Sequence, residues 1–178
     1  IPLLGGTGNV DYTLDANHVV DHLSKAFCGE GQHLYVPAVV SHVQTKRTLM
    51  KEDSIRQIMN AYDHLNVALV GIGTADNTSS AFRSGYYSDE MKQQAIKDQV
   101  CGDICMHLFD KEGRTDRFPY NKQIVGVNLN KLKKVPYAIG IASGVRKAEA
   151  IRGAIKGGYI NVLVTDAQCG QALTRLND

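Results

Sequence analysis

The sequence predicts an α/β domain with a mostly parallel sheet that has helices on both faces. Short apolar runs alternate with amphipathic segments along the whole chain of 178 residues. Runs such as NVALVGIG, residues 66–73, are apolar at nearly every position. Strands of a parallel sheet have this pattern because crossover helices bury both of their faces.

The helices are predicted from apolar residues that recur every three to four positions. In KEDSIRQIMNAYDHL, for example, Ile55, Ile58 and Met59 share one side of a helix and should face the core. Helices are expected at residues 13–28, 51–65 and 90–97, from residue 144 onward, and from the end of the last strand to residue 176.

The strands are predicted from short apolar runs that stop at glycine or at a polar turn. The run CGDICMHLFD contributes one continuous strand before a turn at DKEG, and residues 74–89 form a polar loop. Strands are expected at residues 1–4, 33–36, 66–73, 102–108, 124–128, 137–142 and 159–166.

The composition is that of an ordinary soluble domain. With 43% hydrophobic and 21% charged residues, the chain can build one substantial core, so we expect a single domain over residues 1–178. The net charge of +2 is spread along the chain and gives no basic face for nucleic acid. Four cysteines do not indicate a disulfide scaffold, and no signal-like or twenty-residue apolar segment occurs. We expect a cytoplasmic protein without membrane contact.

The candidate binding site lies in the loops after the strands, because ligands of open parallel sheets bind outside the carboxyl ends of the strands. Gly5 and Gly6 end the first strand, and Gly71 and Gly73 end the central one, so a ligand could approach the backbone closely there. For any single loop, the alternative is that glycine only terminates a strand. Taken together, the glycine loops favour a site.

A second indication is a pair of cations at a helix start. Arg146 and Lys147 fall in the first turn of the helix after Ser143 and Gly144, which is the end that repels cations. With Ser143 as N-cap, this start could bind a phosphate. The alternative is that both cations extend into solvent or pair with Glu149.

Asp103 is the candidate ligand-binding carboxylate. A continuous strand would place it on one face with two cysteines and His107. Side chains two positions apart on a strand are roughly 6.6 Å apart, whereas two thiolates on one zinc ion lie about 3.8 Å apart, so no metal site is expected. The pair of histidines in HVVDH lacks a third ligand. A lone carboxylate is costly to bury, so Asp103 should face a polar ligand.

Several stretches together carry a resemblance to a known family. They are GG after the first strand, NVALVGIG, CGDI followed by FDKEG, and the block VGVNLNKLKKVPYAIGIASGVRKAEAIRGAIKGGYINVLVTD. Over nearly all of its length, the sequence resembles the effector-binding domain of SorC/DeoR-like bacterial transcriptional regulators. The resemblance implies the NagB/RpiA-like (Rossmann-like) fold of ribose-phosphate isomerase and glucosamine-phosphate deaminase, a sugar or phosphosugar effector, and assembly as a homo-oligomer, either dimer or tetramer.

Two features depart from the family pattern. In the family, a helix-turn-helix and a first βα portion with a Gly/Ser/Thr-rich phosphate loop precede the position that Ile1 occupies here. We therefore expect a fragment or a reduced relative, which reaches DNA only through an absent N-terminal domain. Leu4 stands where some relatives have a cation that touches the ligand, so no covalent adduct is expected there.

The resemblance also implies roles for individual residues. The ligand-contacting carboxylate of the family falls on Asp103 and its phosphate-side lysine on Lys147, which fits a carboxylate that accepts sugar hydroxyls and an ammonium that neutralises phosphate. Asp15 and Asn17 match a region of polar ligand contacts, although capping of the first helix is the alternative for both. The expected effector-binding residues are Gly5, Gly6, Asp15, Asn17, Gly71, Gly73, Asp103 and Lys147.

Three classes of function remain open from the residues. A ligand-sensing domain without catalytic activity, cofactor or metal is the expected one. A sugar-phosphate isomerase or deaminase on the same fold is the alternative, because Asp103 and Lys147 could serve as an acid–base pair. A pure oligomerisation module would leave both residues unexplained.

Overall fold

The computed structural model describes the chain except for residues 9–11, 77–78, 80–81, 83–86 and 177–178. The described residues form two compact units. Unit 1 comprises Ile1–His64 and Lys122–Val127, and unit 2 comprises Leu65–Asn121 and Asn128–Asp178. Among the described residues, no helix is long and apolar enough to cross a membrane.

Unit 1 consists of helices and extended segments. Its extended segments meet through isolated bridges, Leu4 with Gly126, Gly6 with Pro37 and Val39 with Ile124. The strands predicted at residues 1–4 and 124–128 are therefore reduced to isolated bridges, and no bridge falls within the strand predicted at residues 33–36. The helices are η1 (Tyr12–Leu14), α1 (Ala16–Ala26), α2 (Val43–Leu49), α3 (Asp53–Ala61) and η2 (Tyr62–His64).

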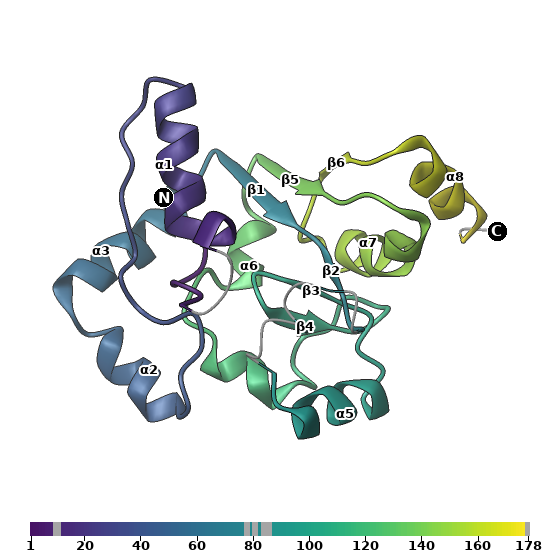
Figure 1. Ribbon diagram of the computed structural model, residues 1–178, viewed down its shortest axis with the longest axis horizontal. Coiled ribbons are helices and arrows are strands. Elements are labelled where there is room, and N and C mark those ends of the chain that lie inside the picture. The colour runs from purple at the N-terminus through teal and green to yellow at the C-terminus, as the bar shows by residue number, and fades with distance from the viewer. Residues whose placement is uncertain (9–11, 77–78, 80–81, 83–86, 177–178) are drawn as a thin grey trace. The chain divides into compact units, whose positions relative to one another are not determined.

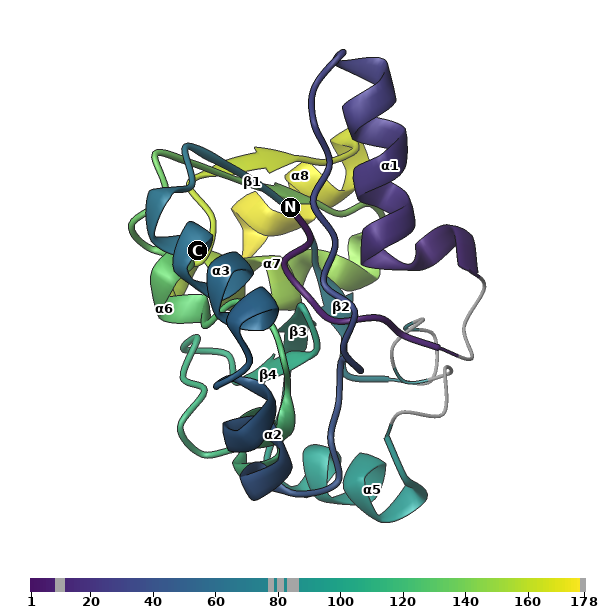
Figure 2. The same cartoon turned by 90° about the vertical axis from the view of Figure 1, so that its left-hand side faces the viewer.

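The core of unit 1 forms along α3. Ile55, Ile58 and Met59 are buried, as their helical spacing predicts, and the Tyr62 hydroxyl donates a hydrogen bond of 2.8 Å to the Pro2 carbonyl. The α1 prediction is also confirmed. Figures 1 and 2 show the extended segment after α1 running back alongside that helix. The sequence did not predict α2, because that helix buries none of its residues and so has no apolar stripe.

Unit 2 contains a three-stranded parallel sheet in the order β1-β5-β6. This arrangement confirms the predicted α/β class with a mostly parallel sheet. Figure 1 shows the three strands side by side, with α7 beneath them and α8 beyond β6. The strands are β1 (Val67–Gly71), β5 (Tyr137–Ile141) and β6 (Val162–Val164). The helices are α5 (Asp89–Lys97), α6 (Leu129–Leu132), η4 (Val145–Lys147), α7 (Ala148–Lys156) and α8 (Ala167–Arg175). The short helix η3 (Pro119–Gln123) begins in unit 2 and ends in unit 1.

The two faces of the parallel sheet differ in burial. Ala68, Val70 and Ala138 on one face are buried, together with Ile151 and Ala154 of α7. The apolar runs predict burial of both faces, but in the described part of the chain the alternate residues of the strands remain exposed. These exposed apolar residues are Val67, Leu69, Tyr137, Ile141, Val162 and Val164.

A second, antiparallel sheet replaces the single strand predicted at residues 102–108. Its strands are β2 (Gly73–Thr74), β3 (Gly102–Ile104) and β4 (His107–Phe109). The chain reverses at Cys105 and Met106, whose φ angles are 48° and 61°. A two-residue hairpin turn with positive φ at both positions is normally signalled by Asn-Gly, which Cys-Met does not resemble. The sequence therefore gives no local signal for this hairpin.

The turn at DKEG is confirmed, and it places Gly113 in close contact with Gly157. Gly113 has a φ of 73°, and its N–H bonds to the Asp110 carbonyl. A Cβ at Gly113 would overlap the backbone of Gly157 at the end of α7. Gly158 has a similar φ of 71°, but among the described residues a Cβ there would meet only the flexible Lys133 side chain, at 3.8 Å.

We expect Gly113→Ala to lower the free energy of unfolding by about 3 kcal/mol, from the left-handed backbone and the overlap together. Gly158→Ala is the matched control and should cost only about 1 kcal/mol, because it carries the backbone penalty alone. Urea unfolding of both variants measures the difference. Equal losses would show that the contact between Gly113 and Gly157 is not tight.

Candidate functional site

The Asp103 carboxylate is the centre of the candidate site. Asp103 lies on β3, directly opposite Gly73 of β2, and is 6% exposed. Its Oδ1 has no hydrogen-bond partner among the described residues. Burial raises the pKa of Asp103 to about 6, although the Lys147 ammonium and the Met106 N–H act in the opposite direction. Near neutral pH, Asp103 is therefore a buried carboxylate with a free acceptor oxygen, which a ligand could satisfy.

Gly73 makes room for this carboxylate. A Cβ at Gly73 would overlap Asp103 Oδ1 and would lie 3.3 Å from the hydroxyl oxygen of Ser79. Ser79 is itself buried. Gly71, by contrast, is exposed at the end of β1, and no atom of the described residues lies within 4 Å of a Cβ built there. Of the two predicted glycines of this loop, Gly73 borders Asp103 and Gly71 faces open space.

Lys147 lies on the same side of unit 2 as Asp103. Its ammonium donates a hydrogen bond to the Ile72 carbonyl between β1 and β2. The Lys147 charge also lowers the pKa of Asp103, so the two groups are close. The structure thus brings together Gly73, Asp103 and Lys147, and their role in effector binding stays a prediction.

The helix start after Ser143 differs from the prediction. Gly144, with a φ of 95°, precedes the short helix η4, and α7 begins only at Ala148, so Ser143 is not the N-cap. The Gly144 N–H donates a hydrogen bond of 2.5 Å to Asp166, whose other oxygen caps α8 through the Cys169 N–H at 2.9 Å. The Gly144 N–H, which a bound phosphate could have used, is therefore already bonded to a carboxylate of the protein.

The cations of this loop are also engaged within the protein. Arg146 lies 3.8 Å from Asp76, and Glu149 pairs with Lys111 at 3.3 Å rather than with the loop cations. Both pairs are exposed, and such pairs contribute little to stability. The structure thus gives each cation a local partner.

Asp15 and Asn17 have structural hydrogen bonds in unit 1. Asp15 caps α1 by accepting from the Asn17 N–H at 2.9 Å and also accepts from the Thr7 N–H at 2.8 Å. The Asn17 side chain bonds both backbone groups of Leu34. These bonds lower the pKa of Asp15, although its partial burial opposes them. They match the capping alternative, and an effector contact of either residue stays a prediction.

Gly5 and Gly6 are held by backbone hydrogen bonds in unit 1. The Gly5 N–H donates to the Val125 carbonyl at 2.9 Å, and the Gly6 N–H donates to the Val36 carbonyl at 2.7 Å. A Cβ at Gly5 would lie 2.6 Å from the Val36 carbonyl oxygen, so glycine permits this close approach. A role of these glycines in effector binding also stays a prediction.

A surface pocket of about 700 Å³ lies beside the same loop but apart from Asp103. Thr74 and Arg146 line it, whereas Thr74 and the Asp103 side chain lie on opposite faces of the β2–β3 ladder. Cys101 also lines it, and burial raises the pKa of this thiol to about 12, so it is not a thiolate nucleophile. Among the described residues, no cluster of three metal-ligating side chains occurs in the chain.

Sequence reasoning missed Ser79, Tyr87 and Met106. Ser79 is buried near Gly73, the Tyr87 hydroxyl donates a hydrogen bond to the Met106 carbonyl, and the Met106 N–H lowers the pKa of Asp103. No sequence pattern indicates these residues, because they come near Asp103 only when distant segments of the chain pack together.

Comparison with known proteins identifies the family. The family model Sugar-bind, described as "Putative sugar-binding domain", matches residues 1–175. The chain is 31% identical over 173 residues to the deoxyribonucleoside regulator of Bacillus subtilis, covering 97% of this chain and 55% of that protein. It is 36% identical over 142 residues to the transcriptional regulator LsrR of Escherichia coli K12, covering 78% and 45%.

A solved structure shows the same relationship. The full-length sorbitol operon regulator SorC from Klebsiella pneumoniae superimposes with a TM-score of 0.89 at 29% identity, covering 98% of this chain and 56% of that one. The chain thus spans about half the length of the curated relatives that it matches. The resemblance seen in the sequence is confirmed, and the chain belongs to the Sugar-bind family, the sugar-binding domains of SorC- and DeoR-type transcriptional regulators.

Proposed function

We propose that this domain binds a sugar or phosphosugar effector at Asp103 and Lys147, and that it reports the effector to a DNA-binding region of a transcriptional regulator. The observation that carries the proposal is the buried Asp103 carboxylate, whose Oδ1 has no partner among the described residues. A carboxylate accepts hydrogen bonds from two neighbouring sugar hydroxyls, so such a ligand would satisfy this oxygen.

Lys147 would recognise the anionic end of a phosphorylated effector. An ammonium on a flexible stem can leave the Ile72 carbonyl and turn to a phosphate as a point charge. Because the Gly144 N–H is bonded to Asp166, the proposal assigns the phosphate contact to the Lys147 side chain rather than to the start of η4. The deoxyribonucleoside and sorbitol regulators among the relatives support a sugar-like ligand.

The proposal extends to the whole protein in four respects. DNA binding would belong to a region outside these residues, the domain would self-associate, the protein would act in the cytoplasm, and the site would bind its ligand without converting it. The naming of the relatives as transcriptional regulators supports a binding role over an isomerase or deaminase.

The test is a thermal-shift panel of ribose, glucose and fructose, each with its monophosphate. A ligand at a hundred times its dissociation constant adds about 2.7 kcal/mol of stability, which is a readily measured rise in melting temperature. The phosphosugars should be recovered without isomerisation. If no sugar raises the melting temperature, or if a phosphosugar is converted, the proposal fails.

Asp103→Asn should weaken binding of sugar and phosphosugar alike and yet stabilise the free protein above pH 6. Because burial raises the pKa of Asp103, the native state holds the proton more tightly than the unfolded chain does. The stability that this proton provides is complete below about pH 4 and is lost as pH rises through about 6. The loss is roughly 3 kcal/mol, because each pKa unit corresponds to about 1.4 kcal/mol.

Urea unfolding at pH 4, 5, 6 and 7 measures this loss. The stability of the unmodified protein should fall across this range relative to Asp103→Asn. Parallel curves would contradict a raised pKa for Asp103.

Gly73→Ala should weaken sugar binding strongly, because the new methyl group overlaps Asp103 Oδ1 and forces the carboxylate to move. Gly71→Ala is the matched control from the same loop, since a Cβ there meets no atom of the described residues within 4 Å. We expect at least a tenfold loss of affinity for Gly73→Ala, or about 1.4 kcal/mol, and little change for the control. Isothermal calorimetry with the best sugar of the panel measures the affinities of both variants. An equal loss of affinity in the two variants would show that Gly73 does not belong to the binding site.

Lys147→Ala should discriminate between a phosphosugar and its free sugar. Loss of a charged hydrogen bond should weaken the phosphosugar by roughly 1.5–3 kcal/mol and the free sugar much less. Arg146→Ala is the control, because Arg146 pairs with Asp76. Calorimetry on both variants measures the two affinities. A loss of the same size for both ligands would remove the phosphate role from Lys147.

A further inference from the structure

The turn between β3 and β4 has a backbone conformation that its two residues do not favour. Cys105 and Met106 both have positive φ angles, 48° and 61°, and neither is glycine. The left-handed region is unfavourable for residues with a Cβ, and two-residue hairpins of this kind prefer Asn-Gly. Such a conformation persists only where surrounding contacts impose it. Other parts of unit 2 must therefore hold this turn.

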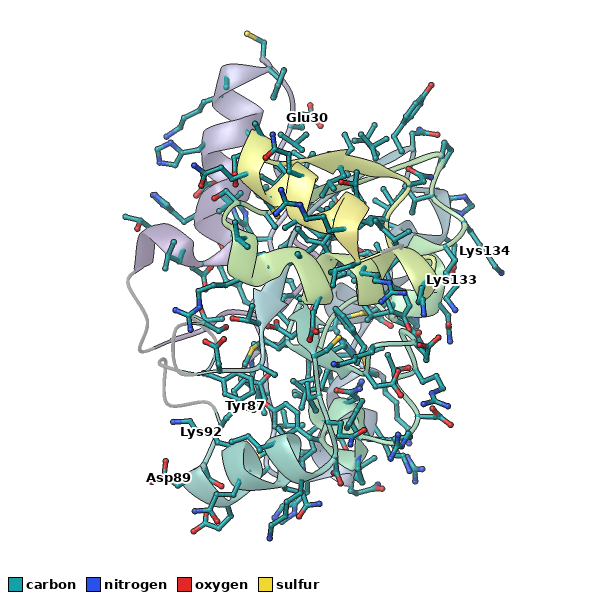
Figure 3. The ribbon with its side chains drawn as sticks, turned by 90° about the vertical axis from the view of Figure 1, so that its right-hand side faces the viewer. Glu30, Tyr87, Asp89, Lys92, Lys133 and Lys134 are labelled. Carbon is teal, nitrogen blue, oxygen red and sulfur yellow. The ribbon has the colours of Figure 1, made fainter. Side chains whose placement is uncertain are left out.

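Tyr87 supplies such a contact. Its hydroxyl donates a hydrogen bond of 3.0 Å to the Met106 carbonyl, and the residue is 2% exposed. The Tyr87 ring stacks on Phe82 and lies against Tyr120, with centroid distances of 4.7 and 4.8 Å. Figure 3 shows Tyr87 where the chain enters α5. The hydroxyl is thus fixed in a packed aromatic cluster and can restrain the turn.

The same turn supports the candidate site. The Met106 N–H lies close enough to the Asp103 carboxylate to lower its pKa. The N–H and the carbonyl of Met106 belong to the peptide groups on either side of its Cα. The φ and ψ angles of Met106 therefore orient both groups together, and fixing the carbonyl restricts where the N–H points.

We propose that Tyr87 is a positioning residue for Asp103: its hydroxyl holds the left-handed Cys105–Met106 turn in the conformation in which the Met106 N–H reaches the carboxylate. The link to ligand binding rests on the proposed function, in which Asp103 contacts the effector. Tyr87 itself touches no effector in this proposal and acts through Met106.

The groups that face Asp103 allow the effect of the turn to be separated from a direct charge effect. They are the Lys147 ammonium, the Tyr87 phenol and the Cys105 thiol. Burial raises the pKa of Tyr87 well above its usual value and that of Cys105 to about 12, so both are neutral near pH 7. Replacing Tyr87 by phenylalanine therefore removes a hydrogen bond and no charge.

The first experiment follows the titration of Asp103 itself by carbon-13 NMR of the side-chain carboxyl groups, with Asp103→Asn to assign the signal. The midpoint should lie near pH 6 in the unmodified protein. In Tyr87→Phe it should rise by about half a unit or more, because the Met106 N–H that favours the charged form moves away from the carboxylate. The affinity at pH 7 for the best sugar of the panel should fall about threefold or more.

Tyr62→Phe is the matched control for a general loss of stability. Tyr62 is also 2% exposed, and its hydroxyl donates a hydrogen bond of 2.8 Å to a backbone carbonyl, that of Pro2 in unit 1. Both variants should lower the free energy of unfolding in urea. Only Tyr87→Phe should move the Asp103 midpoint.

The second experiment is a rescue. Replacing Cys105→Asn together with Met106→Gly gives the turn a sequence that adopts positive φ without help. In this background the Asp103 midpoint should stay near pH 6, and adding Tyr87→Phe should no longer shift it. Should Tyr87→Phe alone be too unstable to titrate, this rescued variant decides the question. A midpoint that is unmoved in folded Tyr87→Phe, or still shifted after the rescue, overturns the proposal.

The two proposals can fail separately, because the titration needs no ligand. A midpoint that shifts as expected, with no sugar of the panel bound, leaves the positioning role standing and refutes the proposed function. Sugar binding by a Tyr87→Phe variant whose Asp103 midpoint is unmoved leaves the proposed function standing and refutes the positioning role.

Discussion

Burial of the Asp103 carboxylate is the constraint on which the candidate site depends. A buried carboxylate with an oxygen that lacks a partner among the described residues is costly, and the surrounding structure reduces that cost only in part. The Met106 N–H and the Lys147 charge favour the ionised form, while burial still keeps the pKa near 6. Because Gly73 has no side chain, the space beside it can hold the Asp103 carboxylate. A hydroxylated ligand would supply the missing donor.

The charges of the loop at residues 143–147 are balanced within the protein. Asp166 accepts from the Gly144 N–H, Arg146 lies near Asp76, and Lys147 donates to the Ile72 carbonyl. The cations at this loop therefore do not require a bound anion to explain them. A phosphate would compete with these internal partners, so its binding energy would be the difference between the new and the existing contacts.

The sequence anticipated the elements whose patterns are local. The spacing of Ile55, Ile58 and Met59 predicted α3, and the apolar runs predicted β1, β5 and β6 in a parallel sheet. The exposed face of that sheet was not anticipated, because an apolar run records a preference for burial and not what covers it. The hairpin at Cys105 and Met106 was hidden for a related reason, since its turn is imposed by contacts and not by turn residues.

By itself, the sequence determined the α/β class and the family, because apolar patterns and motifs are local. It also indicated Asp103, Lys147 and Gly73 as candidate binding residues, and that role stays a prediction. Only the tertiary structure decided how these residues are placed. It placed Gly73 of β2 directly opposite Asp103 of β3. It also gave Asp15 and Asn17 structural hydrogen bonds. It also brought Tyr87 to the Met106 carbonyl, 19 positions away. Contacts between distant segments form only when the whole chain packs, and no local pattern encodes them.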